Sequence, residues 1–375
     1  MQLSYWEKQY FFNKSDLIVI GSGIVGLNAA ISFKKQFPNK QVVILERGII
    51  PTGASTKNAG FACIGSVSEL ADDLTKMSEK NVWETVQLRY SGLKKLRNIV
   101  GDTSMDYQSL GGYEVFDSEE QFELNAAKIP EFNKELLPIT GLQETFIVNH
   151  DKIKETGMKG FSYCIENRAE GQINTGLMMR KLLEIAYQLG IQLFNHIQVL
   201  SINDNLNQVE LICNHDLILK TEKVIVATNG FAKELLSLED VEPARAQVLI
   251  TQPIKNLNLK GSFHYDSGYY YFRNIDNRIL FGGGRNLDFK GENTSHLGLS
   301  DLIQNQLDNL LLTCIIPNTK VDIDRRWSGI MGVGSEKKPI IKHVSNNVVC
   351  AVRMGGMGVA IGSLVGEKAV NTLVD

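Results

Sequence analysis

Short apolar runs alternate with longer amphipathic stretches over much of the chain, a pattern typical of α/β proteins. The runs at 15–20 and 41–46 are rich in branched apolar residues and predict two buried strands. Between them, Leu27, Ala30 and Phe33 recur at helical spacing. This part of the chain therefore predicts a strand, a helix and a second strand.

The same pattern returns in two later parts of the chain. Residues 173–194 predict an amphipathic helix followed by a strand. Three strand-like runs come next, at 196–203, 208–214 and 217–230. Residues 346–374 then predict a strand, a glycine-rich turn and a helix. The chain thus has two glycine-rich junctions between a strand and a helix, more than 300 residues apart.

The first junction carries three glycines in GxGxxG spacing: Gly21, Gly23 and Gly26. Such glycines make a tight turn, let the backbone approach a pyrophosphate and let the helix pack closely on the strand. The helix N-terminus around Ser22, Ile24 and Val25 then offers free N–H groups to phosphate. Because this turn lies between the expected strand and helix, it predicts a dinucleotide site.

An acidic residue ends the second strand. Glu46 lies 20 residues after Gly26, where its carboxylate can accept hydrogen bonds from ribose hydroxyls. An acid at this position disfavours a 2′-phosphate, so NAD or FAD is expected rather than NADP. A glycine-rich turn without a ligand is the plain structural alternative.

The loop that follows distinguishes FAD from NAD. After Arg47 it is rich in small and hydroxyl residues, suited to lie along an extended ligand. Together with "DLIVIGSGIVGLNAA" and "VVILERG", this segment resembles the N-terminal FAD signature of the D-amino-acid oxidase, glycine oxidase and sarcosine oxidase superfamily. The opening "SYWE" and the later "ATNG" favour the branch that includes gamma-glutamylputrescine oxidoreductase-like proteins. The residues that match or accompany the signature are Ala54, Ser55, Thr56, Asn58, Ala59 and Gly60, whereas Lys57 replaces the usual arginine.

The resemblance implies an FAD cofactor and assigns positions along it. The backbone near Val199 would meet the adenine, and the strand ending at Ala227, Thr228 and Asn229 would return to the flavin. The segment from Trp327 to Gly329 would lie beside the ring. The second glycine-rich junction would bring a helix N-terminus to the flavin pyrimidine through Gly355, Gly356, Met357, Gly358 and Val359.

Two blocks, at about 80–165 and 244–325, lie outside the dinucleotide pattern. They contain helical runs and aromatic strands joined by an "IDNR" turn, which predict an antiparallel sheet. The expected fold class is α/β combined with α+β, a Rossmann-like FAD-binding domain with an inserted antiparallel-sheet substrate domain. The expected FAD-binding domain comprises 1–80, 166–243 and 326–375, and the substrate domain comprises 81–165 and 244–325.

The inserted sheet supplies the candidate substrate residues. Strand alternation places Tyr269, Tyr271 and Arg273 on one face, suited to a pocket floor over a flavin. Core aromatic residues with an arginine at the rim are the plain alternative.

One position departs from the resembling enzymes. Where D-amino-acid and glycine oxidases carry an arginine for the substrate carboxylate, this chain has Met331. Either Arg273, Arg285 or Arg353 takes over that role, or the substrate lacks a carboxylate beside its amine.

The resemblance implies oxidation of a C–N bond of an amine or amino acid, with hydride passing to FAD and the imine hydrolysing in water. Sarcosine oxidases hold their flavin through a cysteine, and no cysteine lies within ten residues of Gly329, so noncovalent FAD is expected. No obligatory acid or base is expected, and His264 and His343 are interpreted as ordinary histidines.

Composition narrows the remaining alternatives. The 375-residue chain has a net charge of −3, which disfavours nucleic acid as a partner. Its five cysteines show no CxxC or Cys/His cluster, so no metal site is expected. The N-terminus lacks the apolar core of a secretory signal, and no run is long enough to span a membrane, so a cytoplasmic location is expected. A flavoprotein with a non-amine substrate or an RNA-modifying role, and a plain NAD dehydrogenase, remain alternatives.

Overall fold

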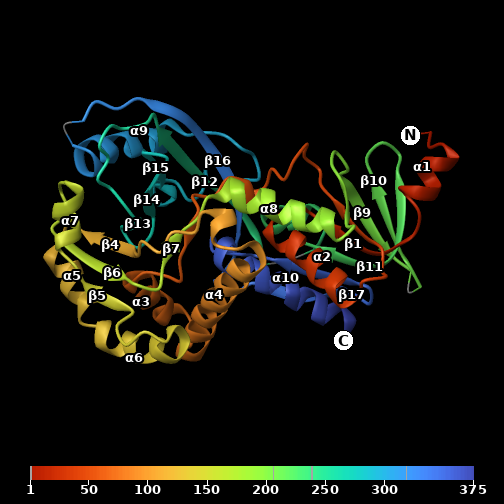
Figure 1. Ribbon diagram of the computed structural model, residues 1–375, viewed down its shortest axis with the longest axis horizontal. Coiled ribbons are helices and arrows are strands. Elements are labelled where there is room, and N and C mark those ends of the chain that lie inside the picture. Colours follow the sequence, from red (N-terminus) through yellow and green to blue (C-terminus); the bar gives the residue numbers. More distant parts are fainter. Residues whose placement is uncertain (1, 206, 238–239, 318) are drawn as a thin grey trace.

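The computed structural model describes residues 2–205, 207–237, 240–317 and 319–375. Two eight-stranded sheets lie at opposite ends of the elongated molecule, with helices packed beside and between them (Figure 1). A short two-stranded sheet, β3 (Phe61–Ala62) with β7 (Gly171–Gln172), lies between the large sheets.

The first large sheet is built around β1 (Ser15–Ile20). It pairs in parallel with β2 (Val42–Leu45) on one side and with β11 (Ile218–Val226) on the other. The order β17-β18-β11-β1-β2-β8 continues to both edges, and β9 and β10 extend from β11 as an antiparallel meander. The outer strands are β8 (Gln192–Phe194), β9 (Val199–Asp204), β10 (Val209–Cys213), β17 (Ile340–Ser345) and β18 (Val348–Val352).

Alternation along β1 separates two cores. Leu17 and Val19 face one core, which also holds the helices α2 (Ile24–Gln36), α4 (Glu79–Val100), α8 (Thr175–Gln188) and α10 (Gly358–Val374). Ile18 and Ile20 face the other core, which the β9–β10 layer covers. Burial on both faces explains why this strand is a continuous apolar run rather than an alternating one.

Gly26 sets the approach of α2 to β1. A Cβ at this position would lie 1.9 Å from the carbonyl oxygen of Gly21, closer than any side chain can come. The third glycine of the motif is therefore required by packing alone, as expected for its place in GxGxxG.

The second large sheet has the order β16-β12-β15-β14-β13-β4-β6-β5. Asp276 and Asn277, both with positive φ, form the tight turn between β14 and β15 that the "IDNR" pattern predicts. Its strands are β4 (Gly112–Phe116), β5 (Phe146–Val148), β6 (Tyr163–Asn167), β12 (Glu242–Thr251), β13 (Ser262–Tyr265), β14 (Tyr270–Ile275), β15 (Arg278–Gly283) and β16 (Ile323–Val333).

The sequence led us to expect an antiparallel sheet, but one pair of its strands is parallel. β13 and β4 pair in parallel, and every other neighbouring pair of this sheet in the described residues is antiparallel. The two parallel strands come from separate chain segments with no hairpin between them, so no turn chemistry marks their direction.

Helices pack around the second sheet. Two helices follow β4, α5 (Glu119–Ala126) and α6 (Ile129–Thr140), and Pro130 in the first turn of α6 separates them because it cannot continue a preceding helix. The remaining helices are α1 (Tyr5–Tyr10), α3 (Val67–Lys76), α7 (Asp151–Thr156) and α9 (Asp301–Leu310), and a π-helical turn at Leu311–Ile315 extends α9.

The proposed domain boundaries can be compared with these elements. The boundary at 325/326 falls inside β16, and the one at 165/166 falls inside β6, two strands of the second sheet. α4 lies within the segment proposed for the substrate domain, yet it packs on α10. The division into two domains stays a prediction.

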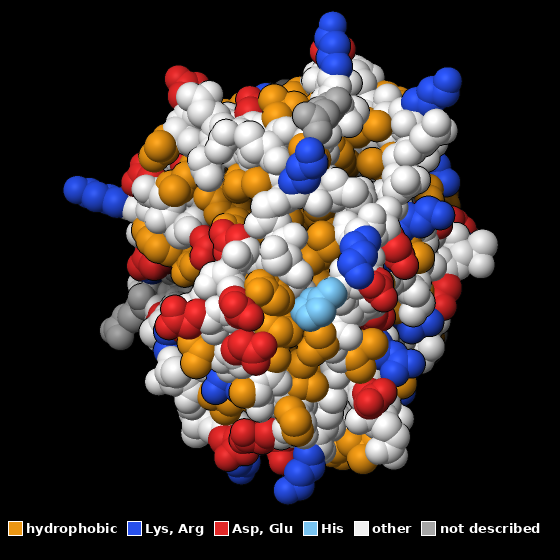
Figure 2. Space-filling view, turned by 90° about the vertical axis from the view of Figure 1, so that its left-hand side faces the viewer, with side chains coloured by type: hydrophobic (Ala, Val, Ile, Leu, Met, Phe, Trp, Pro, Cys, Tyr) orange, Lys and Arg blue, Asp and Glu red, His pale blue; other side chains and the backbone are white. Residues whose placement is uncertain are grey.

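The end of the molecule formed by the second sheet and its helices carries side chains of both charges. Figure 2 shows acidic and basic groups intermixed there with apolar ones. Among the described residues, no helix is long and apolar enough to cross a membrane.

Candidate active site

One elongated cavity of about 880 Å³ connects the two large sheets. Its wall includes the carboxyl ends of β1, β2 and β11, the loop at 52–61, the second glycine turn, and strands β12 to β16. Ligands of open α/β sheets bind outside the carboxyl ends of parallel strands, and this volume lies within the range of small-molecule sites.

Most of the residues chosen from the sequence line this cavity together. They come from seven separate chain segments, which only the fold brings side by side. The lining includes Gly21, Gly23, Ile24, Val25, Glu46, Arg47, Ala54, Ser55, Asn58, Ala59, Gly60, Val199, Ala227, Thr228, Asn229, Tyr271, Gly329, Met331, Gly355, Gly356, Met357, Gly358 and Val359.

The chain holds Glu46 in place at the end of β2. Its Oε2 accepts hydrogen bonds from the Ser22 hydroxyl at 2.6 Å and the Ser22 N–H at 3.2 Å, and its Oε1 accepts one from the Gly48 N–H at 2.8 Å. Ser22 is fully buried and does not line the cavity. It acts on a ligand only by orienting the carboxylate of Glu46.

Several features show that the lining fits a dinucleotide cofactor. Thr228 lines the cavity, and its buried hydroxyl has no hydrogen-bond partner within the protein, as expected for a group that bonds a ligand. Ser55 accepts the N–H of Ile24 at 2.9 Å and so ties the loop at 52–61 to the first turn of α2. Gly356 has φ of +83°, a conformation that side chains rarely adopt, and its backbone borders the cavity.

The second glycine turn differs in detail from what the sequence implied. The N–H groups of Gly355 and Met357 bond the carbonyls of Gly332 and Met354, each at 2.9 Å, so these two donors are not available to a ligand. The first N–H groups of an α-helix have no partner within it. Those of Gly358 and Val359, at the start of α10, are therefore the candidates to face a flavin.

Three other expected cofactor residues support the site without lining it. Gly26 packs α2 against β1, as described above. The Thr56 hydroxyl donates to the Pro51 carbonyl at 2.7 Å, and Trp327 Nε1 donates to the Lys57 carbonyl at 2.9 Å. Both bonds fix the conformation of the loop at 52–61 rather than reach into the cavity.

Arg273 is placed differently from the expected pocket residue. It does not line the cavity, and its buried Nη1 donates to the carbonyls of Gly60 at 2.8 Å and Ile173 at 2.7 Å. Burial lowers the pKa of Arg273 to about 10. The expected alternation of β14 is confirmed, because Tyr271 faces the cavity while Tyr270 and Phe272 pack in the core of the second sheet. Arg273 shares the face of Tyr271 but reaches backbone instead of open space.

The contacts of the three candidate arginines distinguish their roles. Arg353 bonds Asp240 and the carbonyl of Lys338 and lies outside the cavity lining. Arg285 lines the cavity, its buried Nε has no hydrogen-bond partner, and burial lowers the pKa of its guanidinium. Arg285 is therefore the candidate that keeps a free donor beside a bound substrate.

The residues of the cavity wall that sequence reasoning missed include Phe61, Cys63, Glu69 and His264. Cys63 was not expected at the site because the resemblance places a flavin-linking cysteine near Gly329, far from Cys63 in the sequence. In the structure, the Cys63 Sγ lies 3.9 Å from the Met357 sulfur, beside the second glycine turn. Burial, together with nearby carboxylates, raises the pKa of the Cys63 thiol well above its usual range. His264 was interpreted as an ordinary histidine, and no chain neighbour marks it as part of the site.

A Rossmann-like sheet, a second large sheet and one cavity lined by both are the features of a flavoprotein fold. The family model of DAO, the FAD dependent oxidoreductases, matches residues 16–372. The chain belongs to this family, and FAD is its cofactor.

Similar proteins agree with this assignment. The bifunctional protein ThiO/ThiG of Trichormus variabilis is 25% identical over 340 residues, which are 88% of this chain and 48% of that protein. The namesake from Nostoc sp. is 23% identical over 77% of this chain and 42% of its own length. This chain therefore spans less than half the length of these curated relatives.

Solved structures share the fold at low sequence identity. L-proline dehydrogenase from P. horikoshii has a TM-score of 0.77 at 18% identity, covering 96% of this chain and 93% of that chain. Glycine oxidase from Bacillus cereus has a TM-score of 0.76 at 15% identity, covering 96% and 97%.

Proposed function

We propose that this protein oxidises a carbon–nitrogen bond of an amine or amino acid to an imine, which then hydrolyses. Bound FAD supplies the acceptor for the hydride that leaves the carbon. One observation carries the proposal: the cavity that holds the expected cofactor residues is also lined by Phe61, Tyr271, Met331 and Arg285, which lie outside the dinucleotide motifs. A wall that combines aromatic and apolar side chains with a cationic group is suited to a small organic substrate.

The chain's own residues would orient that substrate. Tyr271 and Phe61 form an edge-to-face pair, with ring centroids 5.7 Å apart, and both line the cavity. Burial raises the pKa of Tyr271 to about 12, so its hydroxyl stays protonated and can donate a hydrogen bond. The start of α10 would favour negative charge on the nearby end of the cofactor, because a helix N-terminus carries partial positive charge.

We further propose that Arg285 anchors a substrate carboxylate. Met331 has no charge to offer, and Arg273 and Arg353 are engaged with backbone or Asp240. The free Nε of Arg285 supports this role. If the substrate is an amine without a carboxylate, Arg285 has no partner in the complex, and its substitution would then leave turnover unchanged.

We propose noncovalent attachment of FAD. Cys63 is the cysteine of the described residues that lines the cavity, and the protonated form of its thiol, which the raised pKa favours, is a poor nucleophile.

The test is reduction of the bound flavin without oxygen. Amines and amino acids are added in turn to the purified, FAD-loaded protein, and the visible flavin band is recorded. Bleaching by at least one of them supports amine oxidation. Bleaching by none, with FAD fully bound and reducible by dithionite, would favour the alternative of a flavoprotein with a non-amine substrate or an RNA-modifying role.

A further inference from the structure

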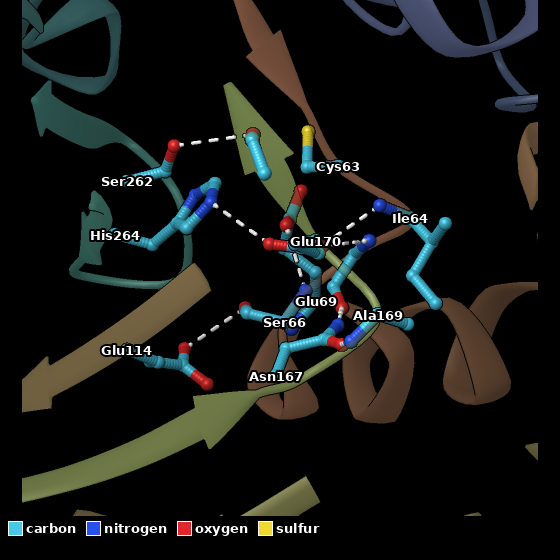
Figure 3. Close-up of polar contacts among 12 residues, drawn as sticks. Cys63, Ile64, Ser66, Glu69, Glu114, Asn167, Ala169, Glu170, Ser262 and His264 are labelled. Atoms are coloured by element: carbon cyan, nitrogen blue, oxygen red, sulfur yellow. Dashed lines mark hydrogen bonds and ion pairs between the residues drawn. The ribbon is translucent and has the colours of Figure 1, made fainter. Parts of the chain in front are cut away.

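Three glutamates surround one histidine at the cavity wall. His264, on β13, is 6% exposed and lines the cavity. Glu114 lies opposite it in the β13–β4 register, Glu170 precedes β7, and Glu69 comes from α3. Figure 3 shows the His264 ring directed at Glu170, with Glu69 and Cys63 nearby.

The two oxygens of Glu170 have different surroundings. Oε1 accepts hydrogen bonds from the N–H groups of Ile64 at 2.8 Å and Gly65 at 3.0 Å. Oε2 lies 3.8 Å from Nε2 of His264, an ion-pair distance, and this Nε2 has no hydrogen-bond partner. Glu170 is 1% exposed, so the chain has buried a carboxyl group with one oxygen fixed and the other facing an imidazole.

The imidazole is held where a substrate would lie. Its ring packs edge-to-face on Phe61, with centroids 5.2 Å apart, and Phe61 packs in turn on Tyr271. All three residues line the cavity. Because Nε2 faces Glu170, Nδ1 is the ring nitrogen left for a ligand.

The protein shifts the pKa of each of the three carboxyl groups around the imidazole. Burial raises the pKa of the Glu114 and Glu170 carboxyl groups, whereas for Glu69 the positive charges of Lys337, His264 and Arg89 outweigh burial and lower the pKa. A buried pair of neutral imidazole and ionised carboxylate carries a net negative charge, and one added proton neutralises it. The titratable and charged groups that face His264 from the packed elements are Glu69, Glu114, Glu170, Arg89, Lys337, Cys63 and Tyr271.

We propose that His264 accepts the proton of the substrate ammonium and that Glu170 is its positioning residue. This rests on the proposed amine oxidation, which needs a neutral amine before hydride can leave the adjacent carbon. One N–H bond of the ammonium breaks and one forms at His264 Nδ1. The step is a proton transfer without oxidation, and the proton leaves later to water.

Glu170 sets the tautomer that makes this transfer possible. Its Oε2 favours a neutral imidazole with the proton on Nε2, which leaves the Nδ1 lone pair open. In Glu170→Gln, the amide oxygen can keep the bonds from Ile64 and Gly65, so the NH2 group turns to His264. The imidazole then carries its proton on Nδ1 and can no longer accept one there, which is the same logic as replacing the triad aspartate of a serine protease by asparagine.

The test uses the FAD-loaded protein with histidine-selective 15N labelling. The chain has six histidines, and His264→Asn identifies the signal of His264 by its loss. Above neutral pH we expect the Nε2–H tautomer in the wild type and the Nδ1–H tautomer in Glu170→Gln. Glu166→Gln is the control, because Glu166 is a carboxylate of the same sheet that lies on the opposite face from Glu114 and His264 and bonds Asn149. An unchanged tautomer in Glu170→Gln would overturn the positioning role.

The second readout is the pH profile of anaerobic flavin reduction by an amine that bleaches the wild type. We expect the rate at pH 7 to fall about 10²-fold in both His264→Asn and Glu170→Gln, while Glu166→Gln keeps the wild-type profile. The acid limb of the profile should be lost in His264→Asn and remain in the control. A wild-type rate and acid limb in His264→Asn would overturn the proton-acceptor role, whereas failure of every amine to bleach the wild type would overturn the proposed function itself.

Discussion

Arg273 donates a hydrogen bond from Nη1 to the carbonyl oxygen of Gly60 at 2.8 Å, linking the second sheet to the loop that follows the cofactor strand. The same nitrogen donates to the carbonyl of Ile173, ahead of α8, at 2.7 Å. One guanidinium therefore fastens two segments of the FAD-binding part to β14. This side chain holds the two parts of the cavity wall together rather than a substrate.

We therefore predict that Arg273→Gln lowers stability. The change removes a buried charge and takes the Arg273 donor from the carbonyl of Ile173, whereas the carbonyl of Gly60 keeps the N–H of Ile173, at a cost of about 1–3 kcal/mol in the free energy of unfolding. Chemical denaturation of the FAD-loaded protein measures it. Arg325→Gln, at a side chain that is 76% exposed, should change the free energy by less than about 0.5 kcal/mol. Equal stability of both variants would contradict this role of Arg273.

For Arg285 we predict the opposite pair of effects, an unchanged stability and weaker binding of the substrate. Arg285→Gln should leave the unfolding free energy nearly unchanged, because no protein acceptor loses a bond from its Nε. It should raise the dissociation constant of a carboxylate-bearing substrate about 10-fold or more, the size of a hydrogen bond to a charged group. Stopped-flow reduction at several substrate concentrations gives this constant. The matched control is the amine that lacks the carboxylate, whose binding should not change.

Much of the fold could be predicted because local sequence patterns determine its helices, strands and tight turns. The βαβ unit at residues 15–46 and the turn at Asp276 and Asn277 follow from apolar periodicity and turn chemistry. Parallel pairing of β13 with β4 could not be predicted, because it joins segments that no short turn connects. Likewise Arg273 and Arg285 look alike in the sequence, and only the backbone that surrounds each one distinguishes their roles.

Gly356 should be required for cofactor binding. Its φ of +83° strains any other residue, and its backbone borders the cavity, so Gly356→Leu should lose bound FAD. Gly141→Leu is the control for strain alone, since Gly141 has φ of +76° with open space around it and caps α6 away from the cavity. Both variants should lose about 1 kcal/mol of stability. Flavin absorbance per protein should fall only in Gly356→Leu, and a full, spectrally unchanged FAD there would contradict the assignment.

Because the Cys63 thiol is buried and protonated, we predict that FAD is not covalently bound and is released when the protein unfolds. Acid precipitation of the protein should leave the flavin in the supernatant and none in the pellet, because the raised pKa keeps the thiol protonated. For the same reason Cys63 should react with iodoacetamide more slowly than the partly exposed Cys314. Mass spectrometry of the alkylated peptides measures both outcomes, and a flavin-bearing Cys63 peptide would show covalent attachment.

The site was harder to predict than the fold. The expected cofactor residues could be named from the sequence because a glycine-rich turn and an acidic strand end require particular residue types at particular spacings. His264 and Glu170 could not, because they meet across 94 residues of chain and neither belongs to a motif. A buried imidazole beside a carboxylate is a property of packing rather than of spacing.

Anaerobic flavin reduction tests the central claim most directly. The FAD-loaded wild type is mixed with a panel of amines and amino acids, and the flavin band is followed alongside the imine-derived carbonyl product. Amine oxidation predicts bleaching by at least one panel member, with one carbonyl product formed for each flavin reduced. An intact flavin band with every amine, in protein whose FAD dithionite still reduces, would contradict the account.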